Sequence, residues 1–276
     1  MSDLWPAPAK LNLMLRITGR RSDGYHTLQT VFQFLDYGDT LRLQVREDGA
    51  INRLTDLPGV MSEHDLTVRA ARLLQRESGS ALGVDITLDK VLPLGGGLGG
   101  GSSDAATVLV ALNQLWGLNL SEDALASLGL RLGADVPVFV RGRAAWGEGV
   151  GEVLTPVNLP EPWYLVVNPG CQVATRKIFG DPELTRDSLP ITMRDFLAGD
   201  DRNDCERVVR RHSPAVAETL DWLGEEARLT GTGACVYVPF VDFAAANAVL
   251  MRLPSRWRGF VAQGCNCSPL NGRRAV

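Results

Sequence analysis

Alternating hydrophobic and polar residues predict several strands along the chain. Residues 9–17 read AKLNLMLRI, so apolar side chains recur at every second position, as in a strand with one buried face. Lys10 and Asn12 then share the other face of this strand. Similar patterns predict strands at 26–35 and 40–45, joined through DYGD, and at 84–88, 136–140, 163–168, 228–240 (a strand pair around a turn) and 258–264.

Apolar residues at helical spacing predict helices between these strands. The helix over 105–116 ends before Gly117, and Ser121 begins a second helix that ends near Gly133. The stretch SEHD, residues 62–65, resembles a capping box and opens another helix. Further helices are expected within 202–226 and 242–253.

A stretch rich in Gly, Pro and Asn, GVGEVLTPVNLPEP at 149–162, separates two parts of the chain. Strands and helices are mixed in both parts, which predicts the α+β class. We therefore expect two domains, over 1–155 and 156–276.

Composition and charge narrow the class of protein. The 276 residues are 45% hydrophobic and 22% charged, which is typical of a globular protein. A net charge of −4 argues against nucleic acid as the main partner. We expect a cytoplasmic protein, because the sequence has neither a secretory signal nor an apolar stretch that could span a membrane. The five scattered cysteines fit reduced thiols, and Cys265-x-Cys267 lacks the second pair that a zinc site requires.

Six of the seven residues from Gly95 to Gly101 are glycine, and a helix follows at once. Such a segment is either a flexible hinge or a cradle whose backbone amides and helix N-terminus bind a polyphosphate. We favour the cradle, because Ser102 and Ser103 can cap the helix and a hinge rarely needs this many glycines. A helix follows where a dinucleotide fold requires a strand, and the Gly-Lys-Ser/Thr of a Walker A loop is absent.

A phosphate-binding segment that has no lysine of its own needs positive charge from elsewhere in the chain. Lys10 lies in an otherwise apolar strand, where an unpaired charge is costly. Asp135 leads into the expected buried strand at 136–140, and Pro137 favours an extended Val136. Each residue could equally form a structural ion pair or cap a helix, so these alternatives stay open on the residues alone.

Four motifs together resemble the GHMP small-molecule kinase family: PAKLNL at 8–13, PLGGGLGGGSSDAA at 93–106, GADVPVF at 133–139 and TGTGAC at 230–235. Within that family, GYHTLQTVFQFLDYGD at 24–39 and NDCE at 203–206 resemble the branch whose acceptor is a cytidine-diphosphate-linked methylerythritol. The resemblance implies two α+β domains with the active site in the cleft between them. It also implies transfer of the ATP γ-phosphoryl group to the 2-hydroxyl of that acceptor, in the non-mevalonate isoprenoid route.

The resemblance also implies the site. Asp135 would act as general base or hydroxyl orienter, with Lys10 as its electrostatic partner. Tyr25 and Phe179 would stack on the cytosine, His26 would bind its edge, and Asn12 and Thr175 would lie near the erythritol and phosphates. The residues implied to wrap the ATP phosphates are Pro93, Leu94, Gly95, Gly96, Gly97, Leu98, Gly99, Gly100, Gly101, Ser102 and Ser103.

Mg²⁺ is the expected metal, with ligands that the sequence leaves unknown. The expected partner is the small-molecule substrate, with no nucleic acid and no membrane, and the chain is expected to be a monomer or weak homodimer. Two alternatives stay open: another GHMP kinase, such as a homoserine or mevalonate kinase, and a nucleotide-binding regulator that transfers no phosphoryl group.

The sequence departs from the family pattern at two positions. Asp104 stands where asparagine is usual, beside the expected phosphates; it either points away from them or helps to hold Mg²⁺. Asp65 replaces an asparagine near the family's adenine pocket. His64 and His212 are expected to be surface residues.

Overall fold

The computed structural model describes residues 4–273, in which ten strands form one sheet. Its main path runs β3-β4-β2-β10-β7-β9-β8, while β1 pairs with β2, and β5 pairs with β2 and β6. The strands are β1 Leu4–Arg20, β2 His26–Arg46, β3 Ile51–Arg53, β4 Gly83–Asp89, β5 Ala145–Glu148, β6 Val153–Pro156, β7 Trp163–Asn168, β8 Arg228–Leu229, β9 Val236–Phe240 and β10 Arg258–Cys265.

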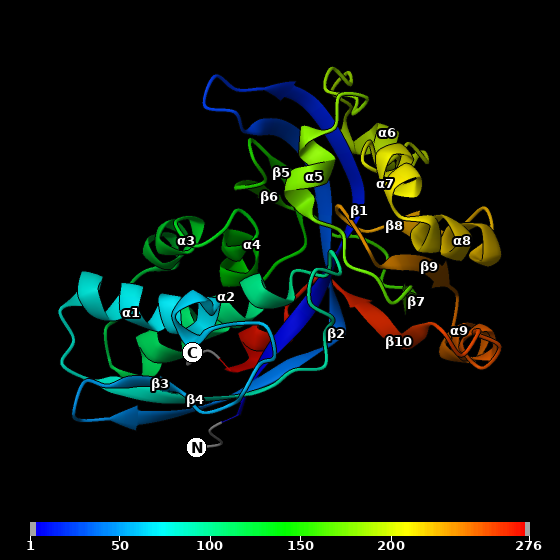
Figure 1. The fold of residues 1–276 in the computed structure, drawn as a ribbon. Helices are drawn as coiled ribbons and strands as arrows, with labels where there is room; N and C mark the ends of the chain where they lie inside the picture. Colours follow the sequence, from blue (N-terminus) through cyan, green and yellow to red (C-terminus); the bar gives the residue numbers. More distant parts are fainter. Residues whose placement is uncertain (1–3, 274–276) are drawn as a thin grey trace.

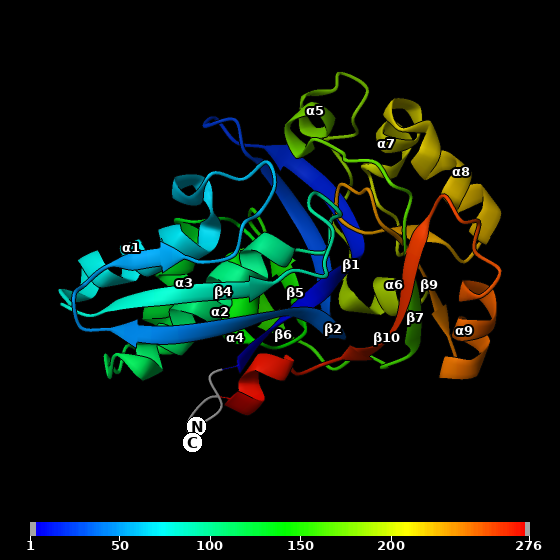
Figure 2. The same cartoon turned by 60° about the horizontal axis from the view of Figure 1, so that its bottom comes forward.

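Helices gather in two groups on this sheet (Figures 1 and 2). The first group lies against β2 and β4: α1 Leu66–Ser78, α2 Gly100–Leu115, α3 Glu122–Leu130 and α4 Val136–Arg141. The second accompanies β7 to β10: α5 Thr175–Gly180, α6 Met193–Leu197, α7 Glu206–His212, α8 Pro214–Leu223 and α9 Phe243–Leu250. Two short 3₁₀ helices are η1 Ser62–His64 and η2 Pro269–Arg273. No helix within residues 4–273 has the length and apolar character needed to cross a membrane.

The strands expected at 26–35 and 40–45 form one continuous strand, β2, so the turn expected at DYGD is wrong. The reason is the partner strand: Pro8 pairs with Gly38 and Ala7 with Asp39 across this stretch. A Cβ on Gly38 would lie 2.3 Å from the carbonyl oxygen of Ala7. Gly38 therefore lets two backbones pass closely, instead of turning the chain.

The buried strand expected at 136–140 is also wrong, because these residues form α4. Short apolar runs do not distinguish a buried strand from a buried helix turn. Pro137 stands in the first turn of α4, where its fixed φ suits a helix and its missing N–H costs nothing. Gly142, at φ 63°, ends the helix in the left-handed conformation.

Two helix starts differ from their predictions, and one agrees. Asp65, not Ser62, caps α1 by accepting a hydrogen bond from the Thr67 amide at 2.7 Å. Gly99 is the N-cap of α2, so Ser102 and Ser103 lie inside its first turn and cap nothing. Ser121 caps α3 as predicted, through the amide of Ala124 at 3.2 Å.

The last strand joins the two halves of the chain. β10 pairs with β7 along most of its length and with β2 at Gly264 and Cys265. After it, Leu270 of η2 packs into the core of the N-terminal half, where Trp5 and Phe139 also lie. The C-terminal residues thus return to the first half, and the division into 1–155 and 156–276 stays a prediction.

Candidate active site

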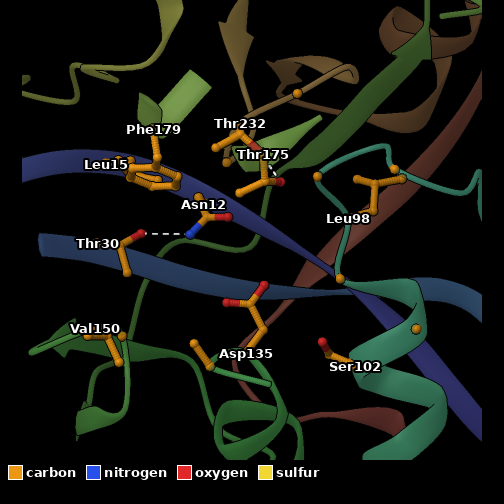
Figure 3. Close-up of a pocket in the computed structure, with 18 of the residues that line it drawn as sticks. Asn12, Leu15, Thr30, Leu98, Ser102, Asp135, Val150, Thr175, Phe179 and Thr232 are labelled. Atoms are coloured by element: carbon orange, nitrogen blue, oxygen red, sulfur yellow. Dashed lines mark hydrogen bonds between the residues drawn. The ribbon is translucent and has the colours of Figure 1, made fainter. Parts of the chain in front are cut away.

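One cavity of about 970 Å³ brings together the residues that the sequence placed in a site, with the exception of Ser103. It is lined by the start of β2, the glycine segment 93–102, the residues before α4, helix α5 and the turn 231–233. Figure 3 shows Asp135 and Ser102 on one side of this space, with Asn12, Thr175 and Phe179 on the other.

The glycine segment is held on both sides by backbone hydrogen bonds. The amide of Lys10 on β1 donates to the carbonyl of Leu98 at 3.0 Å. In the turn after β8, the amides of Ala234 and Cys235 donate to Gly95 and Gly96 at 3.2 and 3.0 Å. These bonds tie the segment's carbonyls to two other parts of the fold, which argues against the alternative of a flexible hinge.

The glycines are required by backbone angles and by close contacts within the protein. Gly95, Gly97 and Gly99 have φ of 69°, 77° and 72°, which residues with a Cβ rarely adopt. A Cβ on Gly97 would lie 2.3 Å from the carbonyl oxygen of Thr230, and one on Gly99 would lie 2.7 Å from the ring of Phe139. Fold contacts thus account for part of the glycine content.

The same geometry leaves a row of amides available to a ligand. Within the described part of the chain, no backbone amide of residues 95–102 donates to a protein acceptor. These residues line the cavity, and the positive end of the α2 dipole adds to them. Ser102 also lines the cavity, whereas the hydroxyl of Ser103 is buried. The geometry of the segment is therefore compatible with binding an anion of several phosphates.

Lys10 and Asp135 meet at the end of this row. The Nζ of Lys10 lies 3.3 Å from Oδ2 of Asp135 and donates to the carbonyl of Gly97 at 3.0 Å. It also donates to Oδ1 of Asn12 and stands 5.7 Å from the centroid of the Phe32 ring. Lys10 is only 2% exposed, while the side chain of Asp135 is 35% exposed and points into the cavity (Figure 3). The pair can therefore offer one reachable carboxylate beside a fixed positive charge.

The other end of the cavity is aromatic. The rings of His26 and Phe179 are stacked, with centroids 5.0 Å apart and planes at 30°. Tyr25 is 63% exposed at the rim, and the hydroxyls of Thr175 and Thr232 lie 3.0 Å apart. Burial lowers the pKa of His26, and the charges of Arg186 and Arg20 lower it further. All predicted site residues except Ser103 thus line one cavity; their individual roles stay predictions.

Comparison with known proteins agrees with this geometry. Residues 65–143 match the family model of the GHMP kinases N terminal domain, and residues 183–259 match that of the GHMP kinases C terminal domain. A curated relative from Halorhodospira halophila, named 4-diphosphocytidyl-2-C-methyl-D-erythritol kinase, is 62% identical over 97% of this chain and 95% of its own. The chain belongs to the GHMP kinase family.

Other relatives of this GHMP kinase carry the same name. One from Alkalilimnicola ehrlichii is 62% identical over 98% of this chain and 93% of its own. A crystal structure of 4-(cytidine 5'-diphospho)-2C-methyl-D-erythritol kinase superposes with a TM-score of 0.81 at 33% identity, covering 95% of this chain and 98% of that one. A mevalonate kinase structure, at 15% identity and a TM-score of 0.68, shares the fold. The predicted family, fold class and type of enzyme, an ATP-dependent small-molecule kinase, are confirmed.

Asp104 of this GHMP kinase turns away from the glycine segment toward Lys90. The Nζ of Lys90 lies 2.6 Å from Asp104 and 2.5 Å from Asp39, and Asp39 also accepts the amides of Val91 and Leu92. Asp104 is buried and does not line the cavity, which favours the predicted orientation away from the phosphates. The cluster joins residues 90–92, which lead into the glycine segment, to β2 and to the N-terminal part of α2.

This cluster predicts a pH dependence of stability. Burial raises the pKa of Asp104 to about 8; Lys90 lowers it and Asp39 raises it. The folded state therefore holds a proton that the unfolded state loses above about pH 4. This contribution to stability is complete below that pH and is lost as the pH rises toward 8. Asp104→Asn keeps a hydrogen-bond acceptor for Lys90 without the titration.

Urea unfolding of the wild type and of Asp104→Asn, at several values between pH 5 and pH 8, checks this prediction. We expect the free energy of unfolding of the wild type to fall relative to the variant as the pH rises. Parallel profiles would show that Asp104 keeps an ordinary pKa.

Two other residues also have structural partners. Asp65, besides capping α1, accepts a hydrogen bond from Arg53 at 2.8 Å, and both side chains are buried. His212 is half-buried, and its Nε2 lies 2.5 Å from Oδ2 of Asp181. A protein that buries such charges compensates them in pairs.

Sequence reasoning missed two residues of the cavity's surroundings. Lys90 could have been suspected, because it follows a strand and stands three residues before the glycine segment. No pattern in the sequence pointed to Arg186, because its partner is far away along the chain. Its Nε donates a hydrogen bond to Nε2 of His26 at 3.1 Å, and the two residues are 160 positions apart.

Proposed function

We propose that this GHMP kinase transfers the γ-phosphoryl group of ATP to the 2-hydroxyl of 4-diphosphocytidyl-2-C-methyl-D-erythritol, in the non-mevalonate route to isoprenoids. The supporting observation is one cavity that has free amides and the Lys10–Asp135 pair at one end and an aromatic pair at the other. Relatives at 62% identity carry the name of this activity.

In this proposal the amides of residues 95–102 and the N-terminus of α2 bind the phosphates of ATP. Asp135 accepts or directs the proton of the acceptor hydroxyl. Lys10 places its positive charge beside Asp135 and offsets negative charge on the transferring group. Because the transition state of phosphoryl transfer is loose, positioning and charge matter more than the strength of the base.

Mg²⁺ fits the proposed site by its donor chemistry. Proteins that bind Mg²⁺ with a nucleotide supply one or two oxygens, and phosphates and water supply the rest. Ser102 and Asp135 offer a hydroxyl and a carboxylate to the same cavity. Residues 4–273 contain no cluster of three His, Cys, Asp or Glu side chains that would form a metal cage. The ion would neutralise charge on the ATP phosphates.

At the other end, we propose that Tyr25 and Phe179 stack on the cytosine and that His26 binds its edge. Asn12 and Thr175 would contact the erythritol and phosphates. Asn12 is held for this role, because its Nδ2 donates to Thr30 at 2.8 Å and its amide donates to Thr230 at 2.9 Å. Stacking contributes about 1–3 kcal/mol per base.

We further propose a cytoplasmic enzyme that is a monomer or weak homodimer and has no nucleic-acid or membrane partner. Its net charge of −4 supports the exclusion of nucleic acid. Analytical ultracentrifugation measures the oligomeric state.

An acceptor panel tests the proposed substrate. We expect ADP release from Mg-ATP with 4-diphosphocytidyl-2-C-methyl-D-erythritol and background rates with homoserine, mevalonate and galactose. Activity with one of the last three alone would contradict the proposal. Nucleotide binding without transfer to any acceptor would indicate a regulator.

A further inference from the structure

Arg186, in the segment after α5, makes four hydrogen bonds around the aromatic end of the cavity. Its Nη2 donates to the carbonyls of Phe179 and Asp181 at 2.8 and 2.7 Å, and its Nη1 donates to Leu184 at 3.0 Å. Its Nε donates to Nε2 of His26 at 3.1 Å. One side chain therefore ties the end of α5, which carries Phe179, to the imidazole at the start of β2.

The chemistry of the guanidinium decides which tautomer His26 adopts. Arginine only donates hydrogen bonds and stays protonated in proteins. The Nε2 of His26 must therefore present a lone pair to Arg186, and the ring proton is on Nδ1. Within residues 4–273, Nδ1 of His26 has no hydrogen-bond partner, although the residue lines the cavity and is only 9% exposed. His26 thus offers an N–H donor to a ligand.

We propose that Arg186 is a positioning residue that fixes the Nδ1–H tautomer of His26 and thereby makes this end of the cavity select cytidine over uridine nucleotides. The proposal rests on the proposed cytidine-linked substrate. The N3 of cytosine is an acceptor and matches an N–H donor, whereas the N3 of uracil carries a hydrogen. With uracil, the N–H of His26 would face the N3–H of the base, and both donors would lack an acceptor. The free-energy cost of these unpaired donors makes the site prefer cytidine over uridine.

The charges around His26 support the same tautomer. Arg186 faces the imidazole from the segment after α5, Arg20 faces it from the end of β1, and Phe179 of α5 covers the ring. Protonation would place a second N–H against the guanidinium of Arg186. The pKa of His26 is lowered accordingly, first by burial and then by these two charges. The ring therefore stays neutral at physiological pH.

The ¹⁵N spectrum of the histidine-labelled protein without ligand is the first test. The chain has three histidines, and His64→Gln removes one of them from the spectrum. We expect His26 to show a protonated Nδ1 and an unprotonated Nε2. His212 provides an internal contrast, because its Nε2 faces the carboxylate of Asp181 and carries a hydrogen. A hydrogen on Nε2 of wild-type His26 would overturn the proposal.

Arg186→Met is the second test, with Arg207→Met as its control. Arg207 lies on α7 with a side chain that is 83% exposed. We expect Arg186→Met to shift the His26 tautomer, to weaken CDP binding about tenfold and to reduce the preference for CDP over UDP, both measured by calorimetry. The KM for the cytidine-linked acceptor should rise with little change in kcat, because Arg186 does not touch the reacting groups.

An unchanged tautomer and an unchanged CDP-to-UDP ratio in Arg186→Met would refute the role of Arg186. If that variant does not fold, the wild-type spectrum alone decides. A wrong substrate can be distinguished from a wrong role of Arg186. If the proposed substrate is wrong, the wild-type enzyme releases no ADP with the cytidine-linked acceptor, while the ligand-free spectrum still reports the tautomer of His26.

Discussion

Asp135→Asn should reduce kcat by about 100-fold to 10,000-fold, with the KM values for ATP and acceptor changed far less. The amide retains the shape of the carboxylate and a hydrogen-bond acceptor, so substrate binding should survive. It cannot accept the hydroxyl proton, and it removes the negative charge 3.3 Å from Lys10. Without that charge, the partners of the lysine among residues 4–273 are all neutral: the Gly97 carbonyl, the Asn12 side chain and the Phe32 ring.

Steady-state kinetics of ADP release measure this effect, with Asp123→Asn as the matched control. Asp123 lies on α3 with a side chain that is 82% exposed, and its ion pair with Arg141 is remote from the cavity lining. The control should keep the wild-type kcat. A near-normal kcat in Asp135→Asn would remove Asp135 from the reaction.

Gly97→Ala should raise the KM for ATP more than tenfold and lower the free energy of unfolding by several kcal/mol. The φ of 77° alone costs an alanine about 1–2 kcal/mol. The new Cβ would also lie 2.3 Å from the Thr230 carbonyl, which is backbone and cannot rotate away. Either the glycine segment or the turn after β8 must then move, and the free amides lose their alignment.

Gly95→Ala separates backbone strain from this collision. Gly95 has a φ of 69° in the same segment, but the nearest atoms to its Cβ would be those of Gln172 at 3.9 Å. We expect it to lose about 1–2 kcal/mol of stability and to keep most of its ATP affinity. Kinetics and urea unfolding of both variants provide the comparison. Equal effects in the two would show that the contact with Thr230 is unimportant.

Much of the site was visible in the sequence. The period-two pattern at 9–17 correctly predicted a strand there and placed Lys10 and Asn12 on one face. The expected single buried face was wrong, because Lys10, Asn12 and Met14 are buried as well. The glycine run before an apolar helix predicted a backbone whose amides face a site, and these residues do line the cavity, while anion binding stays a prediction. Resemblance to known kinases added Tyr25, His26 and Phe179, which no spacing in this chain could have grouped.

The errors arose where tertiary contacts overrode local preference. DYGD has the composition of a turn, yet its pairing with residues 7 and 8 of β1 keeps it extended. VPVFV has the composition of a strand, yet it forms a helix that packs Phe139 edge-on against Phe34. The serines after the glycine run look like caps, yet α2 begins before them at Gly100.

By itself, the sequence determined the long N-terminal strand, the helix after the glycines and the residue types available for phosphate binding, because hydrophobic periodicity and backbone freedom are local properties. The family resemblance implied that Lys10 meets Asp135, and the structure places the two 3.3 Å apart. Only the tertiary structure decided that Lys90 pairs with Asp39 and Asp104, and that Arg186 donates to His26. These partners are far apart along the chain. Their meeting depends on how the sheet and its helices pack, and a buried charge takes whichever partner that packing supplies.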